Sequence, residues 1–147
     1  MIIEQLVYPW TAIYPQSVNN GSAIPSIVDT NGYGFANFIL TNGLVAAAAT
    51  VCKVQESDDM STWGDITGAA LTGSALPAAA DSLKAYAIPV NLLGGRKRYL
   101  KLVYTSGAGA NIISCVCALS RAGVQPSAGG VASISGFSGV STLNTPV

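Results

Sequence analysis

Histidine is missing from this sequence of 147 residues, and cysteine occurs only three times. Histidine is the commonest general base and a usual ligand of zinc and copper, so its absence excludes Ser-His-Asp and Cys-His catalysis and most transition-metal sites. Three cysteines are also one short of a four-cysteine zinc site. We therefore expect a protein that is not an enzyme and that binds no cofactor and no metal.

Charged side chains are scarce as well. They make up 10% of the chain, and 7 Lys and Arg residues balance 7 Asp and Glu residues. An average domain has about 25% charged residues. Proteins that bind nucleic acid need a basic surface, so a neutral chain argues against a nucleic-acid partner. Because a neutral surface promotes association, we expect protein partners to cover much of it.

The sequence also lacks the patterns of export and of membrane insertion. Its first ten residues contain an acid, Glu4, and no basic segment, so we expect no secretory signal. Residues 30–52 carry no charge, but Gly and Asn interrupt the apolar run, and no membrane span is predicted. Without a leader, Cys52, Cys115 and Cys117 are expected to stay reduced.

What the sequence does contain is a repeated two-residue alternation of apolar and polar side chains. It is found in residues 35–41, 50–56, 85–90, 96–105 and 111–121. Such runs, separated by Gly-rich turns, predict strands of an all-β sandwich. Helical periodicity is nearly absent, and only residues 77–84 could form one helical turn. The predicted inward positions are Phe38, Leu40, Cys52, Val54, Tyr86, Ile88, Val90, Leu100, Leu102, Tyr104, Ile113, Cys115, Cys117 and Leu119.

The two ends of the chain differ from the middle. Residues 122–147 have no charged side chain, and their apolar residues recur at intervals of three among Gly and Ser. Uncharged ends with apolar groups favour arms that order against a partner, whereas flexible tails are normally charged and aromatic-poor. We expect an N-terminal arm over 1–21, a sandwich over 22–121 and a C-terminal arm over 122–147. The predicted partner contacts in the arms are Tyr8, Trp10, Tyr14, Val131, Ile134, Phe137, Val140 and Leu143.

Four of the seven acids lie in the segment QESDDMSTWGD, residues 55–65. An EF-hand loop needs oxygen ligands at positions 1, 3 and 5, Gly at 6 and Glu at 12. Counting from Asp59, Gly64 falls at position 6, but position 12 is Ala70. Asp and Ser bond to their own backbone in turns, so the segment predicts a turn between two strands.

The segment GGRKR, residues 94–98, is the only basic cluster. It predicts a hairpin turn followed by charges that protect a sheet edge. The alternative is that Arg96, Lys97 and Arg98 contact an acidic protein partner.

Two segments together resemble a known family: VQESDDMSTWGDI, and RYLKLVYTSGAGANIISCVCAL further along the chain. They are similar to the jelly-roll capsid cement, or head decoration, proteins of tailed phages, most of all those of Bordetella podophages. The resemblance covers about residues 35–121. It implies a jelly roll in which Trp63 and Tyr104 are core and corner residues. It also implies a non-enzymatic virion protein, made in the host cytoplasm, that binds the outside of a shell of major capsid protein, often as a dimer, and clamps neighbouring capsomers.

Two other functions remain open. One is a structural protein of a phage tail or baseplate. The other is a carbohydrate-binding β-sandwich module that would use Trp10, Trp63 or Tyr33 as a stacking platform.

Overall fold

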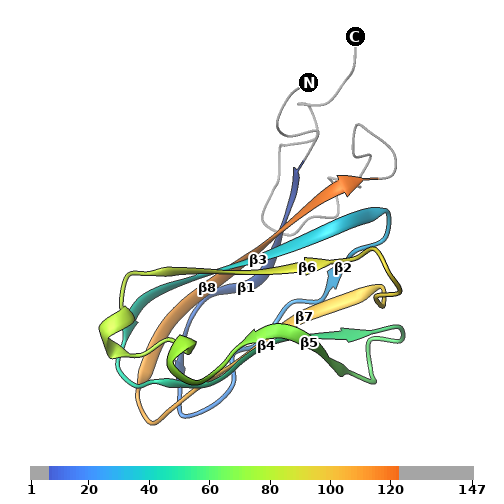
Figure 1. Ribbon diagram of the computed structural model, residues 1–147. Coiled ribbons are helices and arrows are strands. Elements are labelled where there is room, and N and C mark those ends of the chain that lie inside the picture. Colours follow the sequence, from blue (N-terminus) through green and yellow to red (C-terminus); the bar gives the residue numbers. More distant parts are fainter. Residues whose placement is uncertain (1–6, 123–147) are drawn as a thin grey trace.

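The computed structural model describes residues 7–122 as an all-β protein of two antiparallel sheets, seen as an upper and a lower layer in Figure 1. Sheet A has the strand order β1-β8-β3-β6, and sheet B has the order β2-β7-β4-β5. The sandwich expected from the sequence is therefore confirmed. The strands are β1 (Val7–Asn19), β2 (Val28–Asp29), β3 (Tyr33–Val45), β4 (Ala49–Ser57), β5 (Gly64–Leu71), β6 (Ala85–Asn91), β7 (Tyr99–Ser106) and β8 (Ala110–Ala122).

The five alternating runs become β3, β4, β6, β7 and β8, and their predicted inward sides form the core. Phe38, Leu40, Leu100, Leu102 and Tyr104 are all fully buried between the two sheets. Among the predicted inward residues only Tyr86 is partly exposed, and it still packs against the core. The faces are predictable because successive side chains of a strand point to opposite sides, whatever the strand pairs with.

Helical structure in residues 7–122 is limited to two 3-10 turns, η2 (Gly73–Ala75) and η3 (Ala79–Asp81). The second turn lies within residues 77–84, where the sequence allowed a single helical turn. Asp81 stabilises it by accepting a hydrogen bond from the backbone N–H of Ala78 at 3.0 Å.

The N-terminal arm predicted over residues 1–21 is wrong for residues 7–19, which form strand β1 and pair with β8 along its whole length. The alternation is hidden in the sequence because the register shifts twice, between Thr11 and Ile13 and between Ile13 and Gln16. As a result Ala12 and Ile13, which are consecutive, are both fully buried. A bulge of this kind breaks the two-residue period on which the prediction depended.

The C-terminal arm was predicted to begin at Ala122, which is the last residue of β8. The rest of that arm, with its predicted contacts Val131, Ile134, Phe137, Val140 and Leu143, lies outside the described residues.

Candidate functional site

The acid-rich segment connects β4 to β5, and Asp59 organises it as a turn. Its Oδ1 atom accepts hydrogen bonds from the backbone N–H of Thr62 at 2.7 Å and of Ser61 at 2.9 Å, and from the Ser57 hydroxyl at 2.8 Å. These bonds stabilise the carboxylate and hold the pKa of Asp59 far below its usual range. The turn predicted from the sequence is confirmed.

The other three acids of the segment do not converge on Asp59. Within residues 7–122 no three side chains of His, Cys, Asp or Glu gather in a way that could hold a metal ion. Instead each of these acids forms an ion pair. Oε1 of Glu56 lies 3.6 Å from Nη1 of Arg96, and Oδ2 of Asp58 lies 3.8 Å from Nζ of Lys97. Oδ2 of Asp65 lies 2.7 Å from Nζ of Lys53.

Replacing Asp59 by Asn should lower the melting temperature at pH 7, because the amide is a weaker acceptor for three donors at once. The pKa of Asp59 is lower in the folded state than the ordinary 3.8. Its contribution to stability is therefore complete above that value and is lost as the pH falls through the folded-state pKa. In thermal melts from pH 7 to pH 2, the difference in melting temperature between the variant and the wild type should become smaller as the pH falls.

Asp58→Asn is the matched control, since the Asp58 carboxylate is exposed and only loosely paired. The turn mechanism is wrong if the two variants melt alike at pH 7.

The basic segment 94–98 contacts acids of its own chain. The strongest pair is that of Arg98 with Asp29, in which Nε and Nη2 donate at 2.9 and 2.8 Å. This fork raises the pKa of Arg98 and lowers the pKa of Asp29. The backbone N–H of Lys97 also donates to Glu56 at 3.0 Å. With Arg96 and Lys97 facing Glu56 and Asp58, the three cations predicted to contact an acidic partner are charge-balanced within the chain.

Trp63, which the family resemblance placed in the core, instead lies half-buried in the connection before β5. Lys101 from β7 places its Nζ 4.2 Å from the centre of the indole ring, within the range of a cation–π contact. The residue follows a turn rather than a strand, so no alternation directs it inward. Tyr104, the other residue implied by the resemblance, is fully buried.

The aromatic residues near the N-terminus form a cluster within the fold. Tyr8, a predicted partner contact, is buried with only 7% of its surface exposed, so that prediction is wrong. The ring of Tyr8 stacks on Tyr33 at 5.7 Å and lies 6.3 Å from Trp10, which is partly buried against the core. Burial raises the pKa of Tyr8 to about 12. Of the three predicted contacts in β1, only Tyr14 is largely exposed, at 44%.

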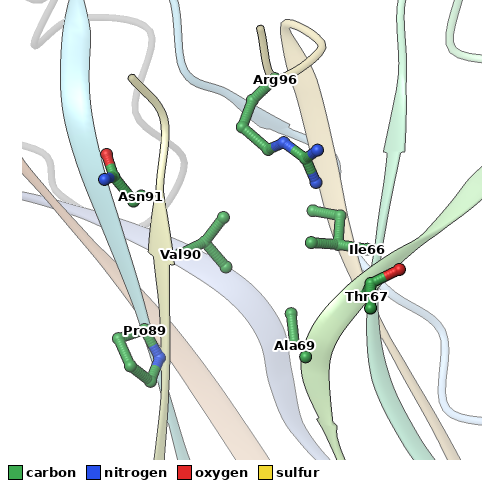
Figure 2. A pocket seen from close by; sticks show the side chains of 8 residues that line it. Ile66, Thr67, Ala69, Pro89, Val90, Asn91 and Arg96 are labelled. Atoms are coloured by element: carbon green, nitrogen blue, oxygen red, sulfur yellow. The ribbon is translucent and has the colours of Figure 1, made fainter. Parts of the chain in front are cut away.

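The pockets in the described part of the chain include two open ones. The first, of about 310 Å³, lies between β5 and β6, where Val90 and Ile66 point toward each other (Figure 2). Arg96 is the only ionisable residue that lines it. The second, of about 320 Å³, is lined by the basic segment together with Asp58, Leu92 and residues 30–32. The first lining set contains no acid, and in the second the Asp58 carboxylate lies 3.8 Å from Nζ of Lys97.

The cysteines are free and buried, as predicted. Burial raises the pKa of Cys52 and of Cys117 to about 12 and raises the pKa of Cys115 as well. Thiols in such surroundings are inert, since only the thiolate reacts.

A thiol reagent added to the native protein at about pH 8 should therefore label all three cysteines at least about 100-fold more slowly than it labels the unfolded chain. The measurement is the rate of release of the reagent's chromophore with and without denaturant. Rapid labelling of native Cys115 or Cys117 would contradict the inward orientation of β8.

Within residues 7–122 no charged residue occupies an outward position of sheet A, although the guanidinium of Arg121, near the end of β8, lies over the ring of Phe35. Strands β8 and β3 alternate between buried and outward positions, and their outward residues pair with those of β1 and β6 in continuous rows, such as Thr11, Val116, Ile39 and Ala87. We call this set the uncharged face. It comprises Val7, Pro9, Thr11, Phe35, Asn37, Ile39, Thr41, Gly43, Ala85, Ala87, Pro89, Asn91, Ile112, Ser114, Val116, Ala118 and Ser120. The outward positions of the alternating runs 35–41, 85–90 and 111–121 are all uncharged, so they could have revealed this face in the sequence.

Comparison with known proteins adds no relative, since neither a protein-family model nor a curated protein matches the chain. Within residues 7–122 there is no helix with the length and apolar character needed to cross a membrane.

Proposed function

We propose that the sandwich is a jelly roll. The support is the strand pairing: β1 pairs with β8, β2 with β7, β3 with β6, and β4 with β5. This is the pattern of one long hairpin of eight strands. When such a hairpin curls, β8 comes beside β3 and β7 beside β4, and both contacts are present. Eight strands in two sheets connected as Greek keys are what define a jelly roll.

We infer that the protein is a virion structural protein that binds the outer surface of an assembled phage capsid and clamps neighbouring capsomers. The observation that carries this proposal is the strand pairing, because it supports a jelly roll, and a jelly roll is the fold of the cement proteins that residues 35–121 resemble. Its partners are the major capsid protein and further copies of itself, and its location is the capsid exterior after synthesis in the host cytoplasm. Many copies, each bound weakly, would act together through avidity.

The ionisable side chains support a role in attachment rather than in chemistry. The Asp59 carboxylate accepts hydrogen bonds within its own turn, and the Arg98 guanidinium donates hydrogen bonds to Asp29. The three thiols are buried. A rigid sandwich whose reactive groups are engaged in this way suits a protein that must hold its shape under load.

The carbohydrate-binding alternative needs an aromatic ring with an open face. Lys101 lies over the ring of Trp63, and Trp10 and Tyr33 both lie beside Tyr8. These contacts favour structural roles for the three rings.

The test is co-sedimentation of the purified full chain with phage heads that lack it, and in parallel with isolated tails. The proposal expects saturable binding to heads, with decorated heads releasing their DNA at a higher temperature than bare heads. Binding to tails alone would support the tail or baseplate alternative, and binding to neither would refute both.

A further inference from the structure

The free edges of the two sheets are poorly suited to accept a strand from a partner. Sheet A ends in β1, which contains Pro9, Pro15 and two register shifts, and in β6, which contains Pro89. Sheet B ends in β2, of two residues, and in β5. Strand β5 loses its register with β4 between Asp65 and Ala70. Proline, bulges and short length are the devices by which natural sheets prevent edge-to-edge pairing, so the edges do not favour strand addition.

The outer face of sheet B is also a poor candidate, because it is charged and internally paired. Lys53 donates to Asp65 at 2.7 Å, and Gln55 donates to the same carboxylate at 2.7 Å. Lys101 is held over Trp63. Burying these groups against a partner would remove water from charges that are already satisfied, and desolvation of that kind opposes binding.

Contact through the uncharged face needs no strand pairing at a sheet edge, and none of the residues in this set is charged. Its apolar side chains Ile112, Val116 and Ile39 are exposed by 47%, 39% and 36%. Two of its hydroxyl groups pair within the face, since the side-chain oxygens of Thr41 and Ser114 lie 2.6 Å apart. Arg121 stands at the rim, 5.7 Å from the ring centre of Phe35. A partner could therefore bury apolar surface here, at about 25 cal/mol per Å², with only the guanidinium of Arg121 at the rim to desolvate.

The size of the face indicates what kind of partner it fits. Four strands at about 4.8 Å spacing and rows covering about 30 Å of strand length give roughly 600 Å². A stable complex of two proteins in solution usually buries about 800 Å² on each. The uncharged face is at the lower end of the range for such complexes, about 600–1,000 Å² on each partner, so it suits a contact that is weak singly and is repeated many times on an assembled lattice.

We propose that the uncharged face lies against the capsid shell, on an uncharged, apolar-rich patch of the shell surface, while the charged face of sheet B points to solvent. This assignment rests on the proposed function and adds the surface through which it acts. Because no ion pair forms across such a contact, binding should depend little on salt, whereas a contact through residues 94–98 would be screened.

The experiment compares two substitutions of one chemistry on opposite faces: Val116→Lys on the uncharged face and Val103→Lys on the outer face of sheet B. Both positions are outward-facing in central strands. Each variant is first melted to show that it folds, and Ile39→Lys replaces Val116→Lys if the latter does not. Binding to heads that lack the protein is measured by co-sedimentation at about 50 and about 500 mM salt.

We expect Val116→Lys to bind at least about tenfold more weakly than wild type, Val103→Lys to bind about as well as wild type, and wild-type binding to be nearly independent of salt. Equal binding by Val116→Lys, or a steep loss of wild-type binding in salt, would overturn the face assignment alone. Failure of the wild type to bind heads would overturn the proposed function itself.

Sedimentation velocity of the free proteins completes the experiment. We expect no change in oligomeric state between wild type and Val116→Lys. A wild-type dimer that Val116→Lys converts to a monomer would show that a second copy occupies the face, and would overturn the proposal.

Discussion

Replacing Asn111 by Ala should lower the free energy of unfolding by about 2–4 kcal/mol. Asn111 is fully buried at the start of β8, and both ends of its amide are used. Its Nδ2 donates to the carbonyl of Ala47 at 2.8 Å and to the Tyr104 hydroxyl at 2.9 Å. Its Oδ1 accepts from the backbone N–H groups of Ala46 and Ala47 at 3.0 and 3.2 Å.

The size of this effect follows from what the substitution leaves behind. The N–H of Ala46 has a second acceptor, the carbonyl of Ala110 at 3.1 Å. Both backbone groups of Ala47 and the Tyr104 hydroxyl would lose the bonds that Asn111 makes. A buried polar group left without a partner costs about 1–3 kcal/mol. This penalty applies in full to the Tyr104 hydroxyl and only in part to the backbone groups of Ala47, because Ala47 is partly exposed.

Chemical denaturation of the full chain measures this effect. Asn19→Ala, at an exposed position of β1, is the control and should change stability by about 0.5 kcal/mol or less. Tyr104→Phe removes only one hydroxyl and should cost about 1 kcal/mol. A loss below about 1 kcal/mol for Asn111→Ala would mean that water or a shifted backbone satisfies the groups of this corner.

Replacing Phe38 by Ala should cost about 3–5 kcal/mol, as expected for a large side chain removed from a close-packed core. Phe38 is fully buried in β3, between Cys117 of β8 and Ile88 of β6. Both neighbours belong to strands of fixed register, so the cavity can collapse only in part.

The control is the next residue along the strand. Ile39 points to the uncharged face, and Ile39→Ala should cost about 1 kcal/mol or less, chiefly through β-propensity. Denaturation midpoints of the two variants compare the two sides of one strand. Equal losses would contradict the assignment of inward and outward sides in β3.

The alternation of the five runs determined more of this protein than any motif did. The inward side of β3, β4, β6, β7 and β8 was predictable because the two-residue period is a local property of an extended chain. The same parity makes the cysteines core residues and leaves one outer face without charge. The turn around Asp59 was predictable for a similar reason, since its bonds reach only two or three residues along the chain.

What the sequence did not determine depends on partners that are distant in the chain. Strand β1 was predicted as an arm because its register shifts arise from its pairing with β8, which is about 100 residues away in the chain. Trp63 was predicted to lie in the core, but it is half-buried and its ring lies against Lys101 of another strand. Arg98 meets Asp29, which is 69 residues away, and no local pattern announces such a pair.

Asn111 is the clearest case of this limit. Its four bonds join the start of β8 to residues 46 and 47 and to Tyr104 of β7, a corner that exists only once both sheets have formed. Asn111 shares the inward parity of its run, so its direction was predictable, but the parity does not show which groups its amide will meet. Local period determines which way a side chain points, whereas the strand order determines what it meets there.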